Sequence, residues 1–289
     1  MEENGNMAQS SAELERSAVK RHFSEAASSF DSAALLHQRV AEELADRLQY
    51  VRLSPAVALD LGCATGFCTA LLAERYPQIQ LIGLDLSCAM LTQNAMLKTR
   101  AVRVAGDAES LPLVEQSVDL VVSNLLLPWC EPANLFGEVH RVLRPAGVFV
   151  FSSLGPDTLK ELKRAWSIVD DTPHVHAFMD MHNLGDTLVA AGFAEPVMDI
   201  EVLTMTYDTL SGLLDDLRAT GGSNALHARR RTLTGRYRAE RLQTAYESFR
   251  GADGRLPSTW EIVYGVAWRP ERSVASETDG VGVPVRLGN

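Results

Sequence analysis

Cysteine is scarce in this sequence and is not arranged for a disulfide framework or a zinc site. The 289 residues contain four, Cys63, Cys68, Cys88 and Cys130, with no C-x-x-C pair and no histidine at zinc-ligand spacing. We therefore expect free thiols in a reducing compartment and no bound metal.

Long apolar runs are also missing. No stretch approaches the ~20 apolar residues that span a bilayer. The polar residues 1–15 lack the apolar core of a secretory signal. The sequence predicts a cytoplasmic protein without a membrane partner. We expect residues 1–16 and 270–289 to be disordered, because they are too polar or too rich in Gly, Ser and Pro to bury much apolar area.

Positive charge is in the minority: 27 Lys and Arg stand against 37 Asp and Glu, a net charge of −10. This balance argues against nucleic-acid binding, which needs a basic face. The exception is residues 229–241 (RRRTLTGRYRAER). We interpret it as a docking patch for an acidic partner, although a solvated helix face is the alternative. The docking residues would be Arg229, Arg230, Arg231, Arg236 and Arg238.

Strand and helix patterns alternate through the first half of the chain, which is typical of a doubly wound parallel sheet with helices on both faces. The predicted strands are nearly continuous apolar runs at 57–61, 80–86, 101–105, 118–122 and 148–153. Later helices are predicted at 156–169, 183–191, 209–219 and 236–250, and later strands at 196–206 and 259–268. The late strands predict an antiparallel addition to the sheet and an inserted cap, in one domain rather than two.

A Gly-rich turn follows the first predicted strand, where residues 62–66 read GCATG. Glycine lets the main chain approach a ligand closely, and ligands of such sheets bind at the carboxyl ends of the strands. Asp60 precedes the turn, Asp85 ends the second strand and Asp107 follows the third. Asp85 is placed to accept the hydroxyl groups of a ribose, Asp107 to face an adenine amino group, and Asp60 to face a cationic amine.

These three acids have no neighbouring Lys or Arg, and the full G-x-G-x-x-G pattern is absent. Both facts argue against a dinucleotide pyrophosphate, and so against an NAD-dependent dehydrogenase. S-adenosylmethionine has no phosphate and carries a cationic sulfonium and an ammonium group. The acidic lining therefore favours S-adenosylmethionine as the cofactor.

The segments 59–66 (LDLGCATG), 83–87, 106–113 and 142–147 resemble the class I S-adenosylmethionine-dependent methyltransferases. The resemblance implies a seven-stranded sheet whose last strand is antiparallel, and it places Asn124 near the transferred methyl group. Ala64 stands where many members have glycine, which costs little if its φ is negative. The predicted cofactor residues are Asp60, Gly62, Ala64, Gly66, Asp85, Leu86, Asp107, Ala108, Asn124, Phe23 and Phe30.

Segments outside this core are similar to the malonyl-[acyl-carrier protein] O-methyltransferases of biotin synthesis. They are residues 21–44, 123–130, 151–166, 178–207 and 254–268, with Pro128 and Val266 as departures. The resemblance implies that the enzyme methylates the free carboxylate of malonyl-acyl-carrier protein, or of malonyl-coenzyme A. We expect a monomer with a helical lid at 17–50 and a methyltransferase domain at 51–269, whose cap spans about 208–250.

Methyl transfer to a carboxylate needs no general base, since an ordinary carboxyl group with a pKa of about 4 is ionised at pH 7. Alignment and exclusion of water remain as the catalytic tasks. A desolvated carboxylate needs a polar or cationic partner, and the candidates are Arg144, Arg164, His174, His176 and His182. The side chains predicted to position the substrate are Asn124, Trp129, His176 and Arg164.

Two other interpretations stay open at this point. One is a methyltransferase for a small acceptor, of the quinone-ring or trans-aconitate type. The other is an assembly-factor-like relative that modifies an arginine or only binds a partner.

Overall fold

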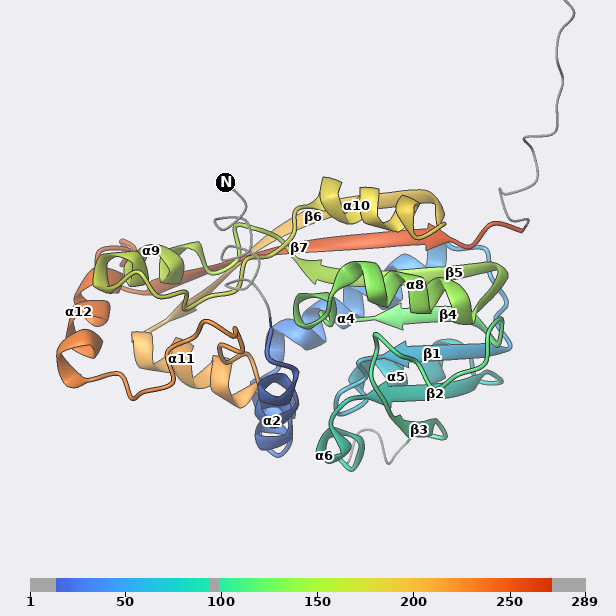
Figure 1. Ribbon diagram of the computed structural model, residues 1–289, viewed down its shortest axis with the longest axis horizontal. Helices are drawn as coiled ribbons and strands as arrows, with labels where there is room; N and C mark the ends of the chain where they lie inside the picture. Colours follow the sequence, from blue (N-terminus) through green and yellow to red (C-terminus); the bar gives the residue numbers. More distant parts are fainter. Residues whose placement is uncertain (1–13, 94–98, 272–289) are drawn as a thin grey trace, which may run out of the picture.

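One seven-stranded sheet forms the centre of the computed structural model, which describes residues 14–93 and 99–271 (Figure 1). The strands are β1 (Val57–Leu61), β2 (Gln80–Asp85), β3 (Val102–Ala105), β4 (Val118–Ser123), β5 (Leu143–Leu154), β6 (Ala194–Tyr207) and β7 (Leu256–Trp268). Their order in the sheet is β3-β2-β1-β4-β5-β7-β6. β1 to β5 pair in parallel, and β7 is antiparallel to both β5 and β6. This confirms the predicted fold class.

Helices cover both faces of the sheet. They are α2 (Arg16–Ala26), α3 (Phe30–Ala33), α4 (Leu35–Arg47), α5 (Phe67–Arg75), α6 (Cys88–Leu91), α8 (Pro132–Val142), α9 (Lys160–Val169), α10 (Met181–Ala190), α11 (Leu210–Ala219) and α12 (Arg236–Glu247). The short 3₁₀ helices are η1 (Leu48–Tyr50) and η2 (Leu127–Trp129). Within the described ranges, no helix has the length and apolar character needed to cross a membrane.

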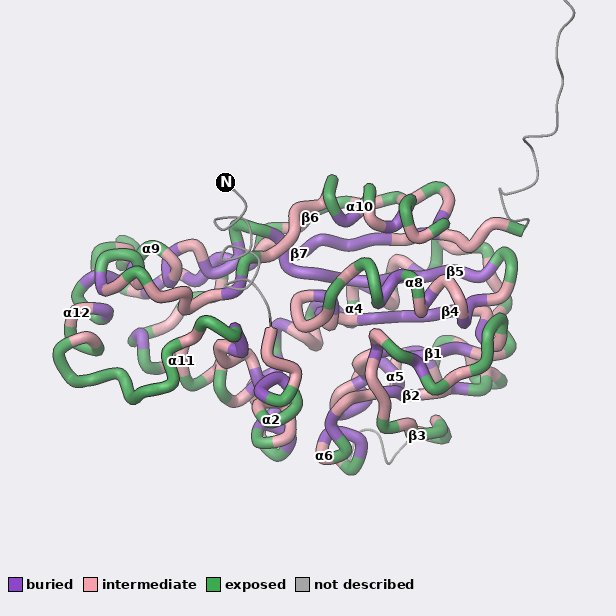
Figure 2. Tube along the Cα trace, in the orientation of Figure 1, coloured by how far each residue is buried: buried purple, intermediate pink, exposed green. Residues whose placement is uncertain are grey.

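Alternate residues of each central strand enter different layers of the core. Val148 and Val150 of β5 pack with α4 and α5, whereas Phe149 and Phe151 pack with α8 and α10. The side chains of successive strand residues point to opposite faces, so a strand covered on both sides is apolar throughout. Figure 2 shows the central strands buried along most of their length.

β6 and β7 continue beyond the rest of the sheet. The end of β5, Leu154, pairs with Ile262, but the β6–β7 ladder runs on to the pair of Tyr207 and Leu256. Helices α9, α11 and α12 gather around this extension at the left of Figure 1. α11 and α12 fall in the range predicted as a cap.

Some predicted boundaries differ from the structure for local reasons. The helix expected at 156–169 begins at Lys160, because the N–H groups of Gly155 and Leu159 donate to carbonyl oxygens of β7 instead. At the amino end, Leu14 forms a bridge with Leu226 and α2 already begins at Arg16. Most of the predicted carboxyl-terminal tail lies outside the described residues.

Candidate active site

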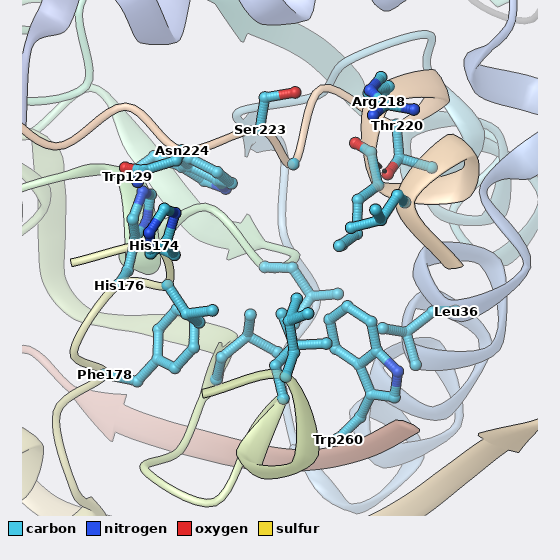
Figure 3. Close-up of a pocket in the computed structure, with 18 of the residues that line it drawn as sticks. Leu36, Trp129, His174, His176, Phe178, Arg218, Thr220, Ser223, Asn224 and Trp260 are labelled. Carbon is cyan, nitrogen blue, oxygen red and sulfur yellow. Dashed lines mark hydrogen bonds between the residues drawn. The ribbon is translucent and has the colours of Figure 1, made fainter. Parts of the chain in front are cut away.

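Three adjoining cavities lie at the carboxyl ends of the parallel strands. The turn cavity runs along the Gly-rich turn and is lined by Asp60, Gly62, Ala64, Thr65 and Asn124, among others. The central cavity lies under α2 and is lined by residues that include Gly62, Asp85, Leu86, Ala108 and Trp129. The apolar cavity opens under α9 and α11, where Leu36, Trp129, Phe178 and Trp260 contribute to its wall (Figure 3).

The Gly-rich turn is held against the end of β2. The N–H groups of Gly62 and Cys63 both donate to the carbonyl oxygen of Leu84, at 2.8 and 3.0 Å. Gly62 has a φ of +73°, and a Cβ there would lie 2.9 Å from the Leu126 side chain. Glycine is therefore required at this position, and its bare backbone leaves room for a ligand.

Ala64 has a φ of +45°, so the condition under which alanine replaces glycine at little cost, a negative φ, is not met. The left-handed conformation costs a residue with a Cβ roughly 1 kcal/mol. Gly66, with a φ of +95°, precedes the first residue of α5 and does not line the turn cavity. The turn thus carries strain that the sequence pattern did not reveal.

Asp60 is buried beneath the turn. Its Oδ2 accepts a hydrogen bond from the Thr69 hydroxyl at 2.5 Å, whereas its Oδ1 has no hydrogen-bond partner. Burial raises the pKa of this carboxyl to about 7. An unpartnered carboxylate oxygen beside a cavity suits a cationic ligand group, so the site fits the ammonium of S-adenosylmethionine.

Asp85 joins the turn to β2. Its Oδ1 accepts from the N–H of Ser87 at 2.7 Å, and its Oδ2 accepts from the N–H of Ala64 at 3.0 Å. Each carboxylate oxygen can accept more than one hydrogen bond, so both remain able to bind the hydroxyl groups of a ribose. Burial raises the pKa of this carboxyl as well.

Asp107 meets a partner that the sequence did not suggest. Its Oδ1 forms an ion pair with Arg16 of α2 and accepts from the N–H of Glu109 at 2.9 Å. The neighbours Gly106 and Ala108 line the central cavity, whereas Asp107 is not one of its lining residues. Because both bonds end on Oδ1, Oδ2 is the atom left to face an adenine amino group.

Asn124 is fixed at the end of β4 by a chain of hydrogen bonds. Its Nδ2 donates to the carbonyl oxygen of His37 at 2.8 Å, and its Oδ1 accepts from the Ser152 hydroxyl at 2.8 Å. The same Ser152 oxygen accepts from the N–H of Leu125, which has a φ of +54°. A strained, hydrogen-bonded turn thus sets the amide where the turn and central cavities meet. His37 was not among the residues predicted for the site.

Aromatic rings separate the central and apolar cavities. Trp129 packs edge to face against Phe23 of α2 and against His176, with ring centroids 5.2 and 4.8 Å apart. His176 is buried, and its Nε2 accepts from the N–H of Ala225 at 3.2 Å. Burial lowers the pKa of His176 to about 4, so the ring is neutral at pH 7. Figure 3 shows Arg218 on the opposite side of the cavity.

The structure brings together most of the residues that the sequence singled out. The central cavity is lined by Phe23, Phe30, Gly62, Ala64, Asp85, Leu86, Ala108, Asn124 and Trp129. His174 and His176 line the apolar cavity. Three candidates lie elsewhere: Arg164 is exposed on α9, Arg144 pairs with Asp119 at 2.7 Å, and His182 is exposed on α10.

The predicted docking arginines divide into two groups. Arg229 and Arg238 are partly buried and pair with Glu15 and Asp170. The exposed arginines are Arg230, Arg231 and Arg236. Of these, Arg231 also pairs with Glu15 at 2.9 Å, and Arg236 pairs with Glu240 at 2.7 Å. Among the residues that the structure describes, no group of three His, Cys, Asp or Glu side chains is arranged to hold a metal ion.

The strand order, the Gly-rich turn after β1 and the acids at the ends of β1 to β3 define a class I S-adenosylmethionine-dependent methyltransferase. A model of the family described as "Methyltransferase domain" matches residues 59–151. The chain belongs to the malonyl-[acyl-carrier protein] O-methyltransferase family. The relative of that name from Methylovorus sp. is 44% identical, with 91% of this chain and 92% of the relative aligned. The relative of the same name from Gallionella capsiferriformans is 43% identical, with 93% of this chain and 96% of the relative aligned.

Solved structures share the fold at low sequence identity. The YcgJ protein from Bacillus subtilis has a TM-score of 0.55 at 16% identity, covering 80% of this chain and 99% of its own. A protein from Bacillus halodurans, described as a methyltransferase, has a TM-score of 0.56 at 17% identity, covering 79% and 99%. These structures confirm the fold. The predicted family, the methyltransferase class and the cofactor S-adenosylmethionine are confirmed by the named relatives and the family model.

Proposed function

We propose that this protein methylates the free carboxylate of a malonyl thioester on acyl-carrier protein, as a step of biotin synthesis. The alignment with relatives named for this reaction includes 91% of the chain, and therefore the late segments that build the apolar cavity. The observation that carries the proposal is the junction of two cavities. The apolar cavity shares Phe23, His37, Leu125 and Trp129 with the central cavity. A second substrate can therefore reach the cofactor from that side.

The reaction requires little acid–base catalysis from the protein. Bound S-adenosylmethionine would supply a methyl group on a sulfonium for transfer to a malonyl oxygen. Asp60 offers a carboxylate to the ammonium group, and the main chain at Gly62 allows close approach. Asn124 keeps one Nδ2 hydrogen available beside the junction, because its other hydrogen is bound to His37. These residues align the reactants, which is the main requirement of an in-line displacement.

Exclusion of water is the second task. Phe23 and Trp129 form one wall of the junction, and α2 covers the central cavity. A carboxylate that loses its water shell is a stronger nucleophile toward the methyl group of a sulfonium, and fixed dipoles replace that shell. This arrangement supports the proposal that residues 17–50 act as a lid.

The exposed part of the basic run is suited to an acidic carrier protein. We define the docking surface as Arg230, Arg231, Leu233, Arg236 and Tyr237. The side chains of Leu233 and Tyr237 are large, apolar and 94% and 71% exposed. Complementary charge steers association, and exposed apolar side chains add contact area. The same loop begins at Ser223 and Asn224, which line the apolar cavity. A carrier bound at the docking surface would therefore lie close to the cavity that its thioester must enter.

Mass spectrometry tests the proposed function directly. Malonyl-acyl-carrier protein incubated with the enzyme and S-adenosylmethionine should gain the mass of one methylene group. Acetyl-acyl-carrier protein, which has no free carboxylate, should gain none. Malonyl-coenzyme A in the same assay compares the two carriers. If the malonyl substrates stay unmodified while a quinone or trans-aconitate is methylated, the proposed substrate is wrong.

A further inference from the structure

His37 of α4 lies where the three cavities meet. Among the described residues, it is the one that lines the turn, central and apolar cavities alike. Asn124 lines the first two, and Trp129 lines the last two. A side chain at this position lies within reach of both a cofactor and a second substrate.

The imidazole of His37 has no hydrogen-bond partner among the described residues, and one of its nitrogens is buried. Nδ1 is buried and forms no hydrogen bond, and the ring packs against Phe30 with centroids 5.1 Å apart. Burial lowers the pKa of His37 to about 4, so the ring carries a single N–H at pH 7. A buried N–H without an acceptor is rarer in proteins than an unused lone pair. We therefore assign the proton to Nε2.

Hydrogen-bond donors are few around the junction. No Lys or Arg lines the turn cavity, which contains the acids Asp31 and Asp60. The cations of the other two cavities are Arg16, Lys20 and Arg218. Arg16 is already paired with Asp107, and Arg218 with Asp215 at 2.5 Å. Lys20 is an exposed residue that lines the central cavity but neither of the other two cavities. Where the cavities meet, the neutral side chains His37 and Asn124 can donate to an anionic group.

We propose that the Nε2–H of His37 donates a hydrogen bond to a ligand carboxylate at this junction. The inference rests on the proposed function, because both the amino-acid end of S-adenosylmethionine and the malonyl group carry a carboxylate. A neutral donor also suits a carboxylate that becomes an ester. Once the negative charge is lost, a buried cation would be left without a partner, whereas a neutral imidazole is not.

Two substitutions test the hydrogen-bond donor of His37 separately from its aromatic ring. His37→Phe keeps an aromatic ring without a donor, and His37→Gln keeps an N–H donor. Calorimetry gives the Kd of S-adenosylhomocysteine and of its decarboxylated analogue, and kinetics give the KM for malonyl-acyl-carrier protein. We expect His37→Phe to weaken one carboxylate-bearing ligand by about tenfold or more, and His37→Gln to restore part of the loss. Binding of the decarboxylated analogue should stay unchanged.

The calorimetric Kd and the kinetic KM together identify which carboxylate His37 binds. A weaker Kd for S-adenosylhomocysteine assigns His37 to the cofactor, whereas a raised KM with an unchanged Kd assigns it to the malonyl group. The inference is overturned if His37→Phe leaves both values within about twofold of wild type. It is also overturned if His37→Phe weakens binding of the decarboxylated analogue as much as it weakens binding of S-adenosylhomocysteine.

His22 provides a matched control. It belongs to α2, and its Nδ1 is also buried without a partner, but it lines none of the three cavities. His22→Phe should leave the Kd and KM unchanged. If His37→Phe does not fold, His37→Leu provides a second side chain without a donor. An enzyme that binds S-adenosylhomocysteine but leaves malonyl substrates unmodified contradicts the proposed function, while the cofactor arm still tests His37.

Discussion

Arg16 and Asp107 form an ion pair across 91 residues of sequence. Arg16 opens α2 and lines the central cavity, and Asp107 follows β3 between two residues that line it, Gly106 and Ala108. The other terminal nitrogen of Arg16 lies 2.6 Å from Oε1 of Glu109. The hydroxyl groups of Ser24 and Ser87 are 2.9 Å apart and make a second connection. The first helix of the described chain is thus fastened to the loops that follow β2 and β3.

Removing this ion pair should weaken cofactor binding. We expect Arg16→Ala to raise the Kd of S-adenosylhomocysteine by about fivefold, since a partly exposed ion pair contributes roughly 1 kcal/mol. Calorimetry measures the effect. Arg21→Ala is the control, because Arg21 lies on the same helix and contacts its near neighbours in sequence, Glu25 at 3.9 Å and His22 at 3.4 Å. Equal affinities for wild type and Arg16→Ala would contradict a role for the pair in holding α2 over the cofactor.

Cofactor affinity should depend on pH through Asp60. Its pKa of about 7 means that below pH 7 the free enzyme carries a protonated carboxyl, which must lose its proton to bind an ammonium group. Affinity should therefore fall by up to about tenfold for each pH unit below 7 and level off above it. Asp60→Asn should bind weakly without this dependence. Asp119→Asn, at a carboxyl that pairs with Arg144, should keep the wild-type profile.

Ala64→Gly should stabilise the fold. The φ of +45° strains alanine and suits glycine, so we expect a gain of about 1 kcal/mol in the free energy of unfolding. For a protein of this size that corresponds to a rise of roughly 2–4 °C in Tm, measured by thermal unfolding. Ala70→Gly, in the interior of α5, should lower Tm instead. A fall in Tm for Ala64→Gly would show that the contacts of its Cβ outweigh the strain.

Charge reversal on the docking surface should weaken binding of the carrier-linked substrate and leave binding of a small thioester unchanged. The double variant Arg230→Glu and Arg236→Glu should raise the KM for malonyl-acyl-carrier protein by at least about tenfold, because like charges then oppose each other. The KM for malonyl-pantetheine, which lacks the protein, should change little. Arg52→Glu is the control, since Arg52 is exposed in the segment before β1. Equal effects on both substrates would rule out docking at this surface.

The parallel part of the fold could be predicted because its strands are buried on both faces. Val148 to Phe151 are apolar without interruption, and no helical period competes with that pattern. The start of α9 could not be predicted, since Gly155 and Leu159 bond to β7, about 100 residues further along the chain. Local patterns contain no information about such distant backbone partners.

The residues of the candidate site also include some that could be predicted from the sequence and some that could not. Asp60, Gly62 and Asp85 could be predicted because each lies at the end of a strand, where such sheets bind ligands. His37 belongs to an amphipathic helix, and nothing in its local pattern marks it as a lining residue. The only signal was the family resemblance over residues 21–44. Arg164 was chosen for its charge, but the face of α9 that carries it is exposed.

The position of β7 between β5 and β6 has a consequence for synthesis on the ribosome. β6 ends at Tyr207 and β7 begins at Leu256, so about 50 residues separate the two strands. The ribosome adds ~5–20 residues per second. The edges of β5 and β6 that will pair with β7 therefore stay unpaired for roughly 2–10 s after β6 has been made. Open strand edges are where chains aggregate. The nascent chain is therefore most vulnerable while α11 and α12 are being synthesised, and arrival of the last strand closes both edges at once.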